Sequence, residues 1–168
     1  MAESTPPGAV VAGVQPGHVR DVMHVAAQVA ERFAVPVVCV TVDAGLLSLG
    51  NRADGSAIIE PLDPDSIDRD PQSISDSDRA AIDAIAAARS VEVEVLTKVG
   101  DPVRAFATVA DERDAVMIVV GTNTGWHRLA ELFNGSVAAR LTRHQRRPVL
   151  VVPTDPVGFD HHSPSDPS

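Results

Sequence analysis

Short apolar runs alternate along this chain with segments whose apolar residues recur at helical spacing. Ala9–Val14, Val35–Asp43 and Ala115–Gly121 are apolar on both faces, which is typical of strands buried inside a sheet. Between the first two runs, a helix over residues 18–33 is predicted by apolar residues at intervals of three and four, namely Val19, Val22, Met23, Ala26, Val29, Ala30 and Phe33. A strand, a helix and a second strand in succession favour a parallel sheet covered on both sides.

The second half of the chain repeats this alternation. A helix that Ser75 caps precedes Val91–Val99, whose alternating pattern predicts a strand near an edge of the sheet. Asp101 is the expected cap of the next helix, with Pro102 at its first position. After Ala115–Gly121, the last helix and the last strand are predicted over residues 136–146 and 148–153.

These elements predict a doubly wound, five-stranded α/β domain with a parallel sheet. In such sheets a ligand lies beyond the carboxyl ends of the strands, where the strand order reverses. The first and fourth strands, Ala9–Val14 and Ala115–Gly121, are the expected flanks of that crevice.

We expect one domain over residues 9–153, between disordered termini at residues 1–8 and 154–168. Residues 44–74 are rich in Gly, Pro, Asp and Ser and predict a long acidic loop. Loops of this length are usually lids, binding loops or disordered insertions, and the composition does not choose between a functional and a merely solvated loop.

Composition excludes several classes of protein. No apolar run approaches the roughly 18 to 20 residues that a membrane helix needs, and the N-terminus lacks the features of a secretory signal. We therefore expect a cytoplasmic protein without a membrane partner. Cys39 is the single cysteine and lies in an apolar run, so it predicts a small buried hydrophobic residue rather than a redox centre.

Charge is unevenly distributed around a net value of −9. Residues 43–78 hold nine acids and two arginines, whereas residues 121–153 hold five arginines and one glutamate. The acidic total argues against nucleic-acid binding. The basic segment contains three glycines, and a small anion would be attracted there.

Those glycines suggest a phosphate site. Gly121 ends a predicted strand, where a glycine allows a sharp turn and the close approach of a ligand. Gly125 follows in the loop, and Gly135 and Ser136 open the last helix. The first N–H groups of a helix lack internal partners and attract phosphate. A plain helix cap explains the Gly-Ser pair equally simply, so the pattern alone leaves both interpretations open.

No catalytic or metal site is predicted. The segment is neither a Walker loop nor the dinucleotide pattern, and the histidines do not share a metal-ligand spacing. His127 lies near Gly125, where it can face a phosphate. Trp126 either covers a ligand or packs against the loop.

The chain resembles the universal stress protein family over about residues 9–153. The most specific match is the family signature G-x2-G-x9-G-S/T, which Gly125, nine intervening residues, Gly135 and Ser136 fit. The stretch "SVAARLTRHQRRPVLVVP" matches the family's ending, and "VGDPVRAFATVADERDAVMIVVGT" looks like its region from the third to the fourth strand.

This resemblance implies a Rossmann-like sheet of the adenine-nucleotide alpha hydrolase type, in the order 3-2-1-4-5. It implies that some members bind ATP or another adenine nucleotide, with Mg²⁺ as an open question, whereas others bind none and act as dimeric stress-response modules. Efficient turnover is not a general property of the family. The residues that the resemblance would place at the ligand are Val14, Gln15, Thr41, Gly121, Gly125, Trp126, Gly135, Ser136 and Val137. Thr41, or its neighbour Val40, would meet adenine through the backbone.

The resemblance also implies a homodimer joined through the last strand, formed by Val149, Leu150, Val151 and Val152. An apolar edge strand of this kind should be covered.

Two departures from the family weaken the implied site. Gly121 and Gly125 are separated by three residues rather than two, which changes how the loop folds over phosphates. The family's nucleotide binders usually carry Asp-Gly-Ser after the first strand, whereas Gln15, Pro16 and Gly17 stand here. Gln15 exchanges hydrogen bonds but offers no charge to the ribose side.

Three functions remain as hypotheses. The first is a dimeric stress-response module that binds an adenine nucleotide. The second keeps the fold and the dimer without a ligand, and the acidic loop 44–74 contacts an unknown protein partner. The third, a slow ATPase, has the least support because no residue stands out as a base.

Overall fold

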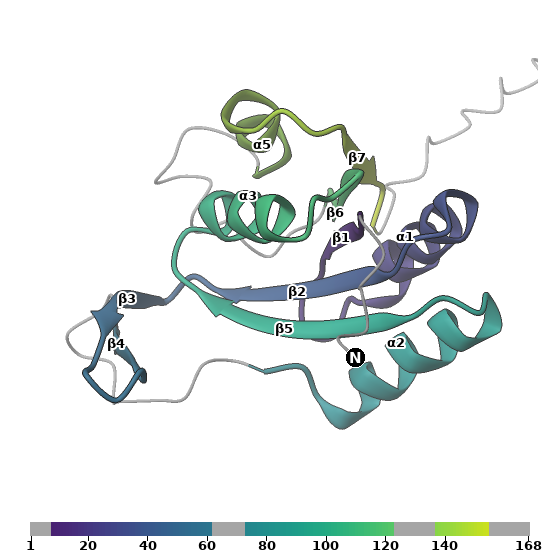
Figure 1. The fold of residues 1–168 in the computed structure, drawn as a ribbon. Helices are drawn as coiled ribbons and strands as arrows, with labels where there is room; N and C mark the ends of the chain where they lie inside the picture. Colours follow the sequence, from purple (N-terminus) through teal and green to yellow (C-terminus); the bar gives the residue numbers. More distant parts are fainter. Residues whose placement is uncertain (1–7, 62–72, 123–136, 155–168) are drawn as a thin grey trace, which may run out of the picture.

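The computed structural model describes residues 8–61, 73–122 and 137–154, and Figure 1 shows how they are arranged. The elements of these residues are, in chain order, β1 (Val10–Gly13), α1 (Arg20–Phe33), β2 (Val37–Asp43), β3 (Leu46–Asn51), β4 (Ala57–Pro61), α2 (Asp76–Ala88), β5 (Val93–Val99), α3 (Pro102–Glu112), β6 (Met117–Gly121), α5 (Val137–His144) and β7 (Val149–Val152). Gly8 and Thr154, at the outer ends of the described residues, are both buried.

The predicted parallel sheet is confirmed. Its strands lie in the order β5-β2-β1-β6-β7, which is 3-2-1-4-5 when the strands of this sheet are numbered along the chain. Every neighbouring pair is parallel. β1 lies at the centre, and its four residues are all buried.

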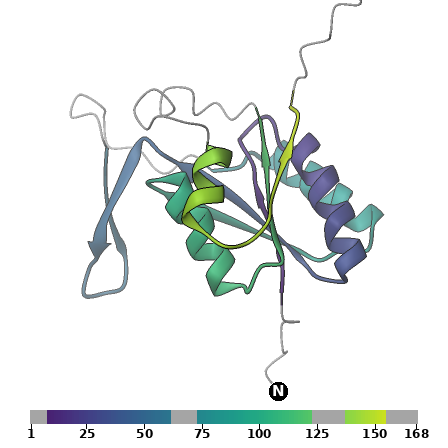
Figure 2. The same cartoon turned by 90° about the horizontal axis from the view of Figure 1, so that it is seen from above.

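Helices cover both faces of the sheet, as Figure 2 shows from above. Successive residues of a strand point to opposite faces, and the core divides accordingly into two clusters. Val10 and Ala12 of β1 pack with α1 and α2, whereas Val11 packs with α3 and α5. Because both faces are buried, the central strands are mostly apolar, and the sequence shows the nearly continuous runs that follow from this.

A close approach between β1 and α3 fixes that helix on the sheet. A Cβ atom added to Gly13 would lie 2.6 Å from Cζ of Phe106 and 3.1 Å from Cγ1 of Val120. Phe106 is fully buried in the same cluster as Val137 and Leu141 of α5. The absence of a side chain at Gly13 therefore lets the largest buried side chain of α3 reach the end of β1.

The prediction that residues 44–74 form a loop is wrong for residues 46–61. β3 and β4 pair as an antiparallel two-stranded sheet that projects from the main body in Figure 1. In its turn, the N–H and hydroxyl of Ser56 donate to Oδ1 of Asp54 at 2.9 and 2.6 Å. These bonds hold the pKa of the Asp54 carboxyl below its ordinary value. The abundance of Gly, Pro and Asp indicated a loop, but Asp54-Gly55 is a hairpin turn between apolar stretches.

The predicted helix starts are confirmed in one case and corrected in the other. The N–H of Asp78 donates to Oγ of Ser75 at 3.1 Å, so Ser75 caps α2 as expected. Asp101 occupies the N-cap position of α3, with Pro102 following, but its side chain makes no capping bond. Its carboxylate instead accepts two hydrogen bonds from Arg140 of α5.

We predict that Gly13→Ala destabilises the fold, because the added methyl group forces Phe106 or the backbone to shift. Overpacking of this kind costs about 1–3 kcal/mol in the free energy of unfolding, which urea denaturation measures. The double variant Gly13→Ala with Phe106→Leu should recover part of that loss, since the two residues are in contact. Unchanged stability in Gly13→Ala would contradict the close packing described here.

We also predict an unreactive thiol at Cys39. Burial raises the pKa of this thiol to about 12, against a lesser opposing effect of Arg79. Iodoacetamide at pH 8 should therefore label Cys39 in urea but not in the folded protein. Reaction of the folded protein at the rate of the unfolded chain would contradict the prediction.

The same pKa shift gives a pH dependence of stability. An unfolded thiol with the ordinary pKa of 9.0 releases its proton above pH 9, while the folded thiol keeps it. The contribution of Cys39 to stability is therefore complete below pH 9 and is lost as the pH rises towards 12, by about 1.4 kcal/mol per pH unit. Comparison with Cys39→Ala, which lacks this slope, isolates the effect.

Candidate functional site

The site lies where the strand order reverses, at the carboxyl ends of β1 and β6. β2 and β5 extend the sheet on one side of β1, while β6 and β7 extend it on the other. Gly13 is aligned with Val40 of β2 and with Val120 of β6. The residues that follow these three on their strands are Val14, Thr41 and Gly121, and all three are buried. The structure thus brings three of the predicted site residues to one edge of the sheet.

A tight turn follows β1. The N–H of Val14 donates to the carbonyl of Val40 at 2.9 Å, and the N–H of His18 donates to the carbonyl of Gln15 at 3.0 Å. Gly17 has a φ of 83°, and Pro16 precedes it, so residues 15–18 form a type II turn. Gln15 is half-buried at the start of this turn.

The first turn of α2 holds this loop in place. The N–H of Gly17 donates to Oδ2 of Asp78 at 2.8 Å. Sequence reasoning missed Asp78, which is 61 positions further along the chain. Its place in the first turn of a capped helix was the available signal, because a carboxylate is favoured there.

Backbone bonds also define the end of β2. Thr41 is almost fully buried. Asp43 is buried as well, its Oδ1 accepts the N–H of Gly45 at 3.0 Å, and its carbonyl accepts the N–H of Gly100 at 3.0 Å. The carboxyl ends of β2 and β5 are therefore tied together beside the crevice.

Packing explains why a glycine stands at position 121, whereas the sequence suggested access for a ligand. A Cβ atom at this position would lie 2.9 Å from Cγ2 of Thr154 and 3.3 Å from Cγ2 of Val22. The N–H of Thr122 donates to the carbonyl of Val152 at 2.8 Å, and the N–H of Thr154 donates to Oγ1 of Thr122 at 3.1 Å. Close packing of the residues after β7 thus accounts for the glycine without a ligand.

Val137 is the first residue of α5 and is a core residue. It is 8% exposed and belongs to the cluster that contains Phe106 and Leu141. Its side chain therefore anchors the start of α5 against α3. Gly125, Trp126, Gly135 and Ser136, which complete the predicted site, lie outside the described residues.

The described part of the edge offers mainly backbone groups and hydroxyls. In residues 8–61, 73–122 and 137–154, no cluster of three His, Cys, Asp or Glu side chains could hold a metal ion. None of the helices in these ranges combines the length and apolarity needed to cross a bilayer. The described groups of this edge can bind a ligand through hydrogen bonds.

Comparison with known proteins supports the resemblance seen in the sequence. A universal stress protein crystallised in complex with cAMP is 27% identical, with a TM-score of 0.57, over 88% of this chain and 97% of that one. Two universal stress protein structures from Archaeoglobus fulgidus, one of them in complex with dAMP, are 22% and 21% identical, each with a TM-score of 0.52. They cover 86% and 89% of this chain and 93% and 99% of their own, and show that the fold is shared. No curated protein matches the chain.

A sequence model of the universal stress protein family matches residues 10–153, which include every element from β1 to β7. The match contains both strands that flank the crevice and the helix start at Val137. On this evidence the chain belongs to the universal stress protein family.

Proposed function

We propose that this protein is a dimeric stress-response module that binds an adenine nucleotide at the carboxyl ends of β1, β2 and β6. The observation that carries the proposal is the alignment of Val14, Thr41 and Gly121 at the point where the strand order reverses. Parallel sheets of this architecture bind ligands at that point. The relative at 27% identity, which was crystallised with cAMP, supports an adenine nucleotide as the ligand class.

The crevice would contact the nucleotide mostly through backbone atoms. Thr41 is on the side proposed for adenine, and Gln15 is on the side proposed for ribose. The Gln15 amide both donates and accepts but carries no charge, so we expect its ribose contacts to be weaker than those of a carboxylate. Phosphate binding falls to Gly125, Gly135 and Ser136, because packing against Thr154 already explains Gly121.

Efficient turnover is not part of the proposal. No member of the predicted residue set is a carboxylate or a histidine that would activate a water molecule. For the same reason, Mg²⁺ would be held through the phosphates rather than by this set, since Mg²⁺ prefers carboxylate ligands from the protein. A cytoplasmic location remains our expectation for such a module.

The dimer is proposed through β7. In the sheet of the described residues this strand is terminal and pairs only with β6. Val151 is 40% exposed, and Val149 and Leu150 are half-buried. A terminal strand with apolar side chains and free backbone groups is a natural surface for a second copy.

A second function deserves a test because of two observations. Packing explains Gly121 without a ligand, and the β3–β4 hairpin exposes Leu47 and Leu49 to 41% and 56%. Under this alternative the protein binds no nucleotide, and the acidic segment that contains the hairpin contacts a protein partner.

Calorimetric titration with ATP, ADP and AMP, each with and without Mg²⁺, separates the two functions. We expect saturable heat, with Mg²⁺ affecting ATP more than AMP because it bridges phosphates.

Replacing Gly135 and Ser136 together by valine should weaken ATP binding by about tenfold or more, since backbone access and a hydroxyl donor are both lost. The dimer should persist in this variant. Absence of both heat and a thermal shift at millimolar nucleotide would leave only the interaction module.

The proposed interface predicts that Val151→Lys yields a monomer, because a lysine on an edge strand opposes pairing with a second strand. Light scattering after gel filtration measures the mass. Leu49→Lys is the matched control, since it introduces the same charge at an exposed apolar position of the hairpin. A monomeric wild type would contradict the proposed dimer, and dissociation by the control alone would place the interface elsewhere.

A further inference from the structure

A groove in the described surface lies away from the proposed nucleotide site. It is a groove of about 540 Å³ between the hairpin, the end of β5 and the neighbouring surfaces of α3 and α5. Leu47, Val99 and Ala105 give it apolar walls from three elements. The volume is in the range of small-molecule sites, and the lining combines these three apolar side chains with six polar or charged ones.

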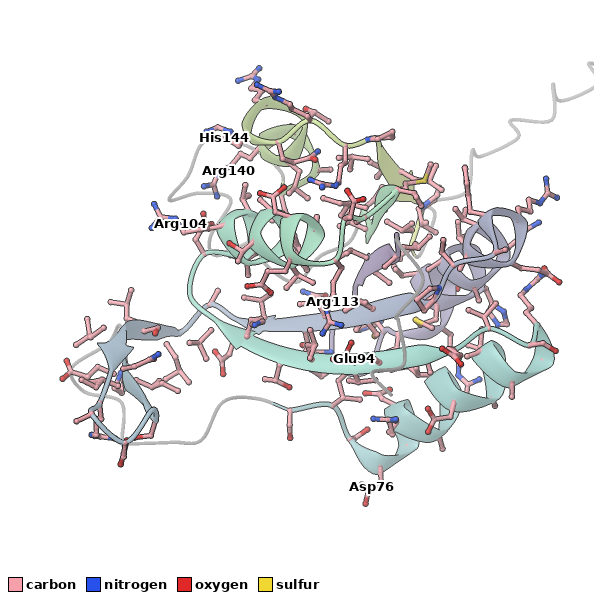
Figure 3. All side chains as sticks on the ribbon, viewed as in Figure 1. Asp76, Glu94, Arg104, Arg113, Arg140 and His144 are labelled. Atoms are coloured by element: carbon pink, nitrogen blue, oxygen red, sulfur yellow. The ribbon has the colours of Figure 1, made fainter. Side chains whose placement is uncertain are left out.

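Three cations line the groove in a protein whose net charge is −9. They are Lys98 of β5, Arg104 of α3 and Arg140 of α5. Figure 3 shows Arg104 and Arg140, with His144, on the side of α3 and α5 nearest the hairpin. Asp101 also lines the groove, so its three cations face one carboxylate, and this excess of positive charge on an acidic molecule favours an anion.

The cations differ in how they are held. Arg140 donates to both carboxylate oxygens of Asp101, at 3.1 and 3.2 Å, which fixes its guanidinium plane. Lys98 is half-buried, and within the described residues neither Lys98 nor Arg104 forms an ion pair. Both side chains can therefore pair with an anionic ligand through charge-assisted hydrogen bonds.

The groove is separate from the edge at β1 and β6. Arg104 and Thr108, which line it, are exposed residues of α3, whereas Phe106 of the same helix points into the core. Val14, Thr41 and Gly121 do not line it. A ligand in the groove and a nucleotide in the crevice would thus contact different sides of α3.

We propose that this groove binds a small organic anion, with a phosphate or carboxylate beside a flat apolar part, independently of the nucleotide crevice. The anionic group is held by Lys98 and Arg104. The apolar part lies against Leu47, Val99 and Ala105, next to the fixed guanidinium of Arg140.

The test uses anilinonaphthalene sulfonate, a fluorescent anion with a flat apolar part, on the full chain. The double variant Lys98→Gln with Arg104→Gln should weaken probe binding by about tenfold or more, since two charged contacts are lost. Arg20→Gln with Arg32→Gln is the matched control, because it removes the same charge from exposed positions of α1 on the other face of the sheet. The control should bind the probe like the wild type.

Thr108→Glu supplies an independent variant that keeps all three cations. Its new carboxylate on an exposed helix position should also weaken probe binding while leaving the melting temperature nearly unchanged. Equal binding by the wild type and both groove variants would place the probe elsewhere and overturn the proposal. So would absence of probe binding, which is the result expected if a segment of this chain fills the groove.

Competition identifies the chemistry and the independence of the site. Naphthyl phosphate and naphthoate, tested separately, distinguish a phosphate from a carboxylate ligand, and at least one should displace the probe. Displacement by uncharged naphthol at the same concentration would overturn the anion assignment. Saturating AMP should leave the probe bound, whereas its displacement by AMP would show that the groove is not a separate site. A protein that binds no AMP at all would defeat the proposed function but not this inference.

Discussion

The contact between Gly13 and Phe106 is the constraint on which the crevice depends. A side chain at Gly13 would collide with the Phe106 ring, so the strand end must be bare for α3 to lie where it does. Phe106 in turn packs in one cluster with Val137 and Leu141 of α5. The start of α5 therefore packs on α3, and α3 packs on the end of β1. The distance between the strand ends and the start of α5 thus depends on the absence of a side chain at Gly13.

Gly121 shows that a glycine at the end of a strand can have either of two roles, ligand access or close packing. A glycine at the end of a strand suggests access for a ligand, but here Thr154 fills the space in front of it. The N–H of Thr122 donates to the carbonyl of Val152 and the N–H of Thr154 donates to Oγ1 of Thr122, and these bonds close the corner between β6 and β7. The chain that leaves the sheet after β7 is therefore fixed beside the proposed nucleotide site.

The parallel sheet was predictable because burial on both faces leaves continuous apolar runs in the central strands. Gly121 was predictable from its place at the end of a strand, whereas Val14 and Thr41 were reachable only through family resemblance. The structure adds that the three residues directly follow Gly13, Val40 and Val120, which are aligned in the sheet. Partner choice was not predictable. Asp101 is of a residue type and at a position typical of a helix cap, yet its carboxylate accepts hydrogen bonds from Arg140, which is 39 positions away. The hairpin was missed because a composition rich in Gly and Asp describes both loops and tight turns.

Hydrogen bonds in the residues before and after the hairpin, rather than in β3 and β4 themselves, hold the flanking chain in place. At its start, Asp43 binds Gly45 and receives the N–H of Gly100. Beyond its end, Ser75 caps α2 and Asp78 holds Gly17. Because loop-closure entropy changes only slowly with length, we expect that a connection of another length can replace this segment. Such an exchange would alter the surface beside α3 and leave the parallel sheet in place.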